Sequence, residues 1–193
     1  MKHRVAITGG IGSGKSYVCQ LLKQQGIDIY DCDQAAKRLM HTSQQLRQEL
    51  TSLIGPDTYI NNVLNKAAVA QFLLTSPQNA EAINAIVHPA VANDFIQSGM
   101  EWMECAILYE SGFDRLVDTV IVVTAPEDVR IRRIMHRDGI GSAKAKEWMG
   151  RQWPQEEVQS RADFEIRNDG QQPLLPQIEI ILQQLKESCN KLF

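Results

Sequence analysis

Apolar and polar positions follow three successive patterns in the N-terminal part of the chain. Residues 4–8 form a short, mostly apolar run with β-branched side chains, which predicts a buried strand. Residues 18–25 carry valine and leucine at helical spacing, and Gly26 stands where the helix would end. Residues 27–30 return to a strand-like pattern. This order predicts a strand–helix–strand unit in a parallel sheet.

Residues 34–103 contain no convincing strand and several helix signals. Ser43 and Asn65 can each cap a helix. A third helix is expected to start at Pro77 and to break at Pro89, where a fourth begins. An insertion of about seventy residues is far too long for a loop. We therefore predict a helical subdomain here, inserted into the sheet domain and suited to binding a second substrate.

The strand pattern resumes after the helical insertion. Residues 105–109 and 119–123 are continuous apolar runs, as expected for strands that are covered on both faces. Residues 164–166 are expected to form the last strand, and residues 174–192 an amphipathic helix that closes the sheet. The pattern as a whole predicts an α/β fold with three layers and a parallel central sheet, built from residues 1–33 and 104–193.

A phosphate-binding loop joins the first predicted strand to the first predicted helix. Its eight residues fit the pattern G-x-x-x-x-G-K-[ST] in the strand–turn–helix context that the motif needs. The glycines let successive N–H groups point at phosphate oxygens, and the helix N-terminus adds partial positive charge. Lys15 can reach the β- and γ-phosphates, and Ser16 can ligate Mg²⁺. The loop consists of Gly9, Gly10, Ile11, Gly12, Ser13, Gly14, Lys15 and Ser16.

An arginine-rich helix follows the strand at residues 119–123. Arg130, Arg133 and Arg137 share one face of it, and a glycine-containing turn and a second helix come next. Such charged faces are most often solvated surface. A phosphate loop needs cations opposite it, however, so we predict a hinged lid over residues 128–153.

Composition restricts the partners of the protein. The chain has 193 residues with a net charge of −3, which argues against nucleic acid or an anionic membrane held by bulk charge. We find no signal peptide and no apolar run long enough to span a bilayer, so a cytoplasmic protein is expected. We expect a monomer or a small homo-oligomer.

Three classes of phosphate-loop protein fit the motif. A GTPase switch requires the guanine-selecting pattern N-K-x-D, and the two Asn-Lys pairs in the chain do not continue in that way. A motor or transporter ATPase would usually be larger. A kinase acting on a small molecule or a nucleoside monophosphate needs a base, Mg²⁺, cations and a lid, and candidates for each are present.

Two acidic residues follow predicted strands and are candidates for the chemistry. Asp33 comes after the strand at residues 27–30, so its carboxylate should lie at the edge of the sheet where open α/β folds bind ligands. It can act as a catalytic base, or it can only cap the next helix. Asp31 would face the same side if the strand continued. Glu110 holds the corresponding place after residues 105–109.

Motifs along nearly the whole chain resemble those of the dephospho-coenzyme A kinase family. The matching segments are TGGIGSGKS at residues 8–16, Asp31-Cys32-Asp33, His88-Pro89, Leu108-Tyr109-Glu110, Arg133, Arg137-Asp138, Gln152, Ala162-Asp163 and Asn168. The resemblance implies transfer of the ATP γ-phosphate to the ribose 3′-hydroxyl of dephospho-coenzyme A. It also implies a nucleotide core, a helical coenzyme A subdomain and a lid.

The family resemblance also implies roles for individual residues. Asp33 becomes the expected base, which acts together with Lys15 and Arg137. Arg133 and Arg137 are expected at the ATP phosphates, and Asn168 near the adenine. The acceptor site is expected to involve Asp33, Lys37, His88, Leu108 and Glu110.

Two positions depart from the family pattern. Tyr17 stands where threonine is usual, so a hydroxyl contact to the α-phosphate is expected to be lost or replaced by the backbone. Lys37 stands where arginine is usual, which keeps the charge but not the two-pronged hydrogen bonding.

Overall fold

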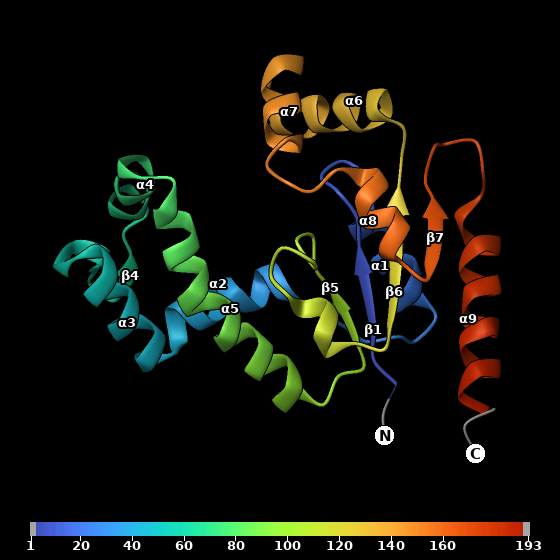
Figure 1. Cartoon of the computed structure of the whole chain (residues 1–193), viewed down its shortest axis with the longest axis horizontal. Coiled ribbons are helices and arrows are strands. Elements are labelled where there is room, and N and C mark those ends of the chain that lie inside the picture. Colours follow the sequence, from blue (N-terminus) through green and yellow to red (C-terminus); the bar gives the residue numbers. More distant parts are fainter. Residues whose placement is uncertain (1–2, 191–193) are drawn as a thin grey trace. The chain divides into compact units, whose positions relative to one another are not determined.

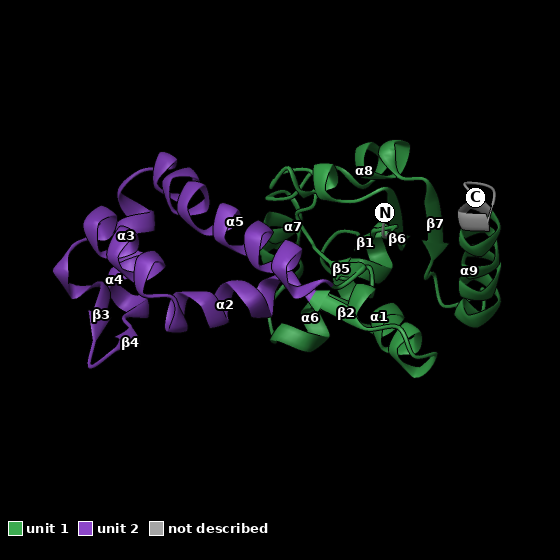
Figure 2. Cartoon of the chain, turned by 90° about the horizontal axis from the view of Figure 1, so that it is seen from below, with its two compact units in different colours: residues 1–30, 100–193 green, residues 31–99 purple. Residues whose placement is uncertain are grey.

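The structure is a computed structural model that describes residues 3–190. The chain forms two compact units, unit 1 (Met1–Tyr30 and Met100–Phe193) and unit 2 (Asp31–Gly99), which are coloured separately in Figure 2. Unit 1 holds the central sheet and the phosphate loop.

Five strands form the central sheet of unit 1. They are β1 (Val5–Thr8), β2 (Ile29–Asp31), β5 (Trp102–Glu104), β6 (Thr119–Thr124) and β7 (Phe164–Arg167), in the spatial order β2-β5-β1-β6-β7. β1 pairs in parallel with β5 and β6, and β6 pairs in parallel with β7 (Figure 1). The α/β fold with a parallel sheet is therefore confirmed.

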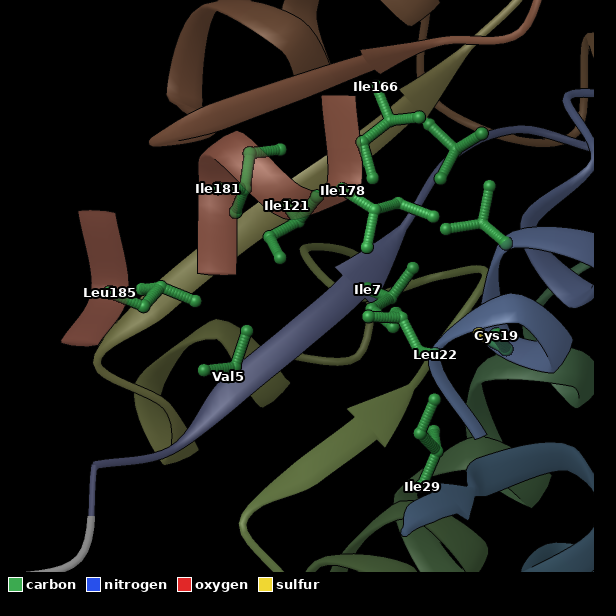
Figure 3. Packing of buried hydrophobic residues seen from close by; sticks show 12 residues of the cluster. Val5, Ile7, Cys19, Leu22, Ile29, Ile121, Ile166, Ile178, Ile181 and Leu185 are labelled. Atoms are coloured by element: carbon green, nitrogen blue, oxygen red, sulfur yellow. The ribbon is translucent and has the colours of Figure 1, made fainter. Parts of the chain in front are cut away.

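Helices cover both faces of this sheet. α1 (Lys15–Gln24) and α9 (Leu174–Asn190) pack on the face to which Val5 and Ile7 point, and Figure 3 shows the resulting isoleucine-rich core. Val120 and Val122 point the other way, because successive side chains of a strand alternate. α8 (Gln155–Arg161) contacts β6 and buries its valine there. Unit 1 also contains α6 (Glu127–Asp138), α7 (Ser142–Met149) and a 3₁₀ turn at Phe113–Leu116.

The strand predicted at residues 105–109 is wrong. The strand is β5, three residues earlier, and the sheet ladder ends when the N–H of Cys105 donates to the carbonyl of Ile7 at 3.0 Å. The chain then turns, with the N–H of Ser111 donating to Ile107 O at 2.9 Å. Cys105 and Leu108 of this segment are buried and its other residues are partly buried, so an apolar run here reflects packing of a turn and not a strand.

Unit 2 consists mainly of four helices: α2 (Cys32–Thr42), α3 (Gln44–Ile54), α4 (Lys66–Thr75) and α5 (Gln78–Ser98). Ser43 and Asn65 cap α3 and α4 as predicted, because their side chains accept backbone N–H bonds. α5 packs against the other three helices, and Arg38 of α2 pairs with Asp94 of α5 at 2.5 Å.

Two sequence expectations for unit 2 are wrong. Pro89 does not break a helix, because α5 runs without interruption through it. Val87, Val91 and Phe95 are buried on either side of the proline, and their packing outweighs the hydrogen bond that proline cannot make. The second error is a missed hairpin, β3 (Tyr59–Ile60) with β4 (Val63–Leu64) after the 3₁₀ turn Pro56–Thr58. Its two-residue turn is Asn-Asn with positive φ at both positions, a recognisable hairpin signal.

Candidate active site

The phosphate loop follows β1 and ends where α1 begins. Gly14 is the N-cap of α1 in the left-handed region, with φ of 93°, and Lys15 is the first helical residue. Gly9 has φ of 141°, and a Cβ atom there would lie 2.2 Å from the Val123 carbonyl oxygen. The loop is thus packed directly against β6. Only glycine satisfies both the backbone angle and the close approach at these positions.

Gly14 provides a direct test of this packing. A Cβ atom on Gly14 would lie 2.1 Å from the Asn168 Nδ2 atom, and its φ is unfavourable for any L side chain. We expect Gly14→Ala to destabilise the protein by about 1–3 kcal/mol and to weaken ATP binding at least about tenfold. Thermal unfolding and ATP titration measure both effects. Gly26→Ala is the control, because it shares a positive φ of 83° but has open space around it. Equal ATP affinity in both variants would contradict the assignment.

Side chains from outside the loop hold its backbone carbonyl groups. Arg130 Nε donates to Ile11 O at 3.0 Å, and Arg133 Nη1 donates to Gly12 O at 3.3 Å and Ser13 O at 3.1 Å. Asn168 Nδ2 also donates to Ser13 O, at 2.9 Å. These three residues orient consecutive peptide groups of the loop. They also place two guanidinium charges beside it, which favours an anion in the loop.

Arg130 is the most buried of the lid arginines. Its side chain is buried, and burial lowers the pKa of its guanidinium, although Glu156 and Glu127 act in the opposite direction. An arginine guanidinium nevertheless keeps its proton at neutral pH. Arg137 differs, because its side chain is exposed and pairs with Asp138 at 2.8 Å. The predicted arginine face is therefore divided: Arg130 and Arg133 lie on the phosphate loop, whereas Arg137 lies at the end of α6.

The structure reveals one acidic residue that the sequence reasoning missed. Ser16 Oγ donates to Glu104 Oε1 at 3.0 Å, at the end of β5. Glu104 also acts on the buried Cys19: burial first, and then Glu104, raise the pKa of that thiol. A hydroxyl oxygen beside a carboxylate oxygen is a suitable donor set for Mg²⁺. Glu104 was missed because the strand was predicted too late, so that Glu110 was taken as the strand-end acid.

The segment after β5 is fastened to the segment that follows α7. Glu110 Oε1 accepts the N–H of Trp153 at 3.0 Å, and the Trp153 ring stacks on Tyr109 with 5.8 Å between centroids. The guanidinium of Arg161 lies 4.6 Å from the Trp153 centroid. Leu108 is fully buried, and its carbonyl accepts from Phe113 and Ser111. The Leu108 side chain is thus packed inside unit 1, and its expected contact with the acceptor stays a prediction.

Unit 2 carries the predicted residues Asp33, Lys37 and His88. Asp31 Oδ1 accepts the N–H of Gln34 at 2.9 Å, so Asp31 is the N-cap of α2 and Asp33 is not needed as a cap. The strand ends at Asp31, and the two carboxylates therefore do not extend along one strand as expected. Asp33 and Lys37 are exposed in the first half of α2. His88 lies on α5, and burial lowers its pKa, which favours the neutral imidazole.

The other predicted residues are placed as follows. Lys15 is half-buried at the start of α1, and Tyr17 is 55% exposed in its first turn. Within residues 3–190 we find neither a helix capable of crossing a membrane nor a group of three histidine, cysteine or acidic residues positioned for a metal ion.

Comparison with known proteins identifies the relatives of this chain. Residues 3–173 match the model of the dephospho-CoA kinase family. A dephospho-CoA kinase from Porphyromonas gingivalis is 40% identical over 189 residues, which cover 94% of each chain. A crystal structure from Thermus thermophilus has a TM-score of 0.79 and 29% identity, covering 97% of this chain and 98% of the other. Dephospho-CoA kinase from Campylobacter jejuni shares the fold, with a TM-score of 0.66, 18% identity and full coverage of both chains.

Proposed function

Because the chain belongs to the dephospho-CoA kinase family, we propose that it phosphorylates the ribose 3′-hydroxyl of dephospho-coenzyme A with ATP. The products are coenzyme A and ADP, and the reaction is the last step of coenzyme A synthesis. The observation that carries the proposal is the phosphate loop, whose carbonyl groups are held from outside by Arg130, Arg133 and Asn168. A loop fixed in this way is preorganised for a nucleotide phosphate chain.

The loop and the first residues of α1 bind the ATP phosphates in this proposal. Carbonyl groups that are bound from outside orient the adjoining peptide groups, which favours N–H groups turned toward the ligand. Lys15 stands at the positive end of α1 and neutralises charge on the β- and γ-phosphates. Asn168, expected near the adenine, is buried against Ser13, so it supports the loop as well.

Ser16 and Glu104 would hold Mg²⁺. Their oxygens lie 3.0 Å apart, and both are of the hard type that this ion prefers. When bound, Mg²⁺ supplies charge neutralisation to the β- and γ-phosphates. Ser16 would contribute its hydroxyl oxygen and Glu104 its carboxylate to this site.

Asp33 is the proposed base for the acceptor hydroxyl. Its carboxylate is exposed, and in the described part of the chain we see no hydrogen bond or ion pair to it. It would accept the proton of the 3′-hydroxyl as the oxygen attacks the γ-phosphorus and ADP leaves. Lys37, His88 and Glu110 are proposed to contact the acceptor. Arg137 is proposed to leave its ion pair with Asp138 and to bind phosphate oxygens of ATP when residues 128–153 act as a lid.

An acceptor panel tests the proposed substrate. Purified protein with Mg·ATP is mixed with dephospho-coenzyme A, adenosine monophosphate, shikimate or buffer alone, and ADP and the phosphorylated product are measured. We expect ADP formation to rise at least about a hundredfold with dephospho-coenzyme A, with a product that carries a 3′-phosphate. Equal or faster turnover with another acceptor would favour a different small-molecule kinase. ATP binding without turnover on any acceptor would contradict the kinase proposal.

A further inference from the structure

Both backbone polar groups of Ile11 are bound by side chains. The N–H of Ile11 donates to Gln152 Oε1 at 2.7 Å, and its carbonyl accepts from Arg130 Nε at 3.0 Å. Two side chains that are distant from the loop in sequence therefore hold the backbone of a single residue of the phosphate loop. The Gln152 amide also donates to Ala106 O at 3.2 Å. Gln152 therefore bridges the phosphate loop and the turn after β5.

The two residues that hold Ile11 come from opposite ends of one segment. We call α6 and α7 together the arm (residues 127–149). Arg130 lies in the first part of α6, and Gln152 follows the last residue of α7 by three positions. The segment that carries Gln152 is further fixed by the Glu110–Trp153 bond and by the Tyr109–Trp153 stack. Arg130 near the start of the arm and Gln152 just after its end thus both bind Ile11, and Arg133 within α6 also binds the loop, at the carbonyls of Gly12 and Ser13.

We propose that Gln152 is a positioning residue that fixes the Ile11 peptide group for nucleotide binding. The proposal rests on the proposed function and extends it to a residue outside the phosphate loop. Ordering a backbone residue costs conformational entropy, and a loop already held by Gln152 avoids that cost when the nucleotide binds. Gln152 therefore acts on affinity for the phosphate chain, and it links that affinity to the position of the arm. It does not take part in the chemical step.

Gln152→Leu tests the proposal because leucine has a similar size but makes neither hydrogen bond. We expect two results. In ¹⁵N-isoleucine-labelled protein without nucleotide, hydrogen exchange at the Ile11 amide should be at least about tenfold faster, while Ile134 in α6 is unchanged. The dissociation constants of ATP and ADP should both rise about tenfold, while kcat at saturating substrates changes less than about threefold.

Gln152→Glu and Gln159→Leu sharpen the test. The glutamate keeps an acceptor for the Ile11 N–H and loses the donor toward Ala106 O, so we expect protection of the Ile11 amide to be largely retained. Gln159 is an exposed glutamine of α8 whose side chain donates to Glu165 at 2.8 Å, away from the phosphate loop, and its variant should behave like the unmodified protein. Unchanged Ile11 exchange in Gln152→Leu would overturn the proposal, as would a fall confined to kcat. Amide exchange needs no turnover, so this readout is independent of whether the proposed reaction is correct.

Discussion

Replacing Lys15 by alanine is expected to lower kcat/KM by about 10³–10⁵-fold. Lys15 is the first residue of α1, directly after the left-handed Gly14, and no other lysine lies in the loop. Its ammonium group contributes both to binding ATP and to stabilising charge on the transferred phosphoryl group. A hydrogen bond between charged groups contributes about 1.5–3 kcal/mol, and loss of one transition-state donor typically costs about 10²–10³-fold in rate. Steady-state kinetics with ATP and dephospho-coenzyme A measure the first quantity, and ATP titration measures the binding part.

Lys23→Ala is the matched control for this experiment. Lys23 is an exposed lysine in the last turn of the same helix, so its removal changes the net charge equally and costs at most a few tenths of a kcal/mol in stability. We expect its kinetics to be unchanged within about twofold. If Lys15→Ala kept ATP affinity and turnover within tenfold of the unmodified protein, Lys15 would have no role at the phosphates.

The local sequence pattern is sufficient to predict the phosphate loop and most of the secondary structure. The signals that predict the loop are local in the sequence. They are the spacing of the glycines, the β-branched run before the loop and the amphipathic helix after it. The wrong predictions of secondary structure arise where contacts between residues distant in sequence determine the local structure. The apolar run at residues 105–109 is buried at Cys105 and Leu108 and partly buried elsewhere, yet its backbone pairing with β1 ends at Cys105. Pro89 stays helical because residues on both sides of it pack in unit 2.

The candidate site shows the same division between local and long-range information. The motif predicts Lys15 and Ser16, and the resemblance adds Arg133 and Asn168. Their bonds to loop carbonyls, however, join residues more than a hundred positions apart. The periodicity of a sequence does not predict hydrogen bonds between such distant residues. Glu104 could have been found as an acid directly after the apolar pair Trp102-Met103, but the longer apolar run after it decided the prediction.

Asp33→Asn is expected to lower turnover by about 10²–10⁴-fold with little change in ATP affinity. Asparagine has the same shape and can still accept a hydrogen bond from the acceptor hydroxyl, but it cannot take the proton. Because Asp31 caps α2, the variant leaves the helix N-terminus intact, and we expect the unfolding midpoint to move by less than about 2 °C. A capping role would instead predict nearly normal turnover, since asparagine caps a helix as well as aspartate does.

The pH dependence separates these two roles. A carboxylate base must be ionised to act, so in the unmodified protein kcat/KM should rise with pH from the acidic side and then level off. In Asp33→Asn that rise in kcat/KM should disappear, while any pH dependence that comes from other ionisable groups remains. Asp28→Asn, at an exposed position between α1 and β2, removes the same charge from unit 1 and should keep both the rate and the profile. A retained acidic limb in Asp33→Asn would assign the base to another residue of the acceptor site, and His88, whose pKa is lowered by burial, would be the first to replace.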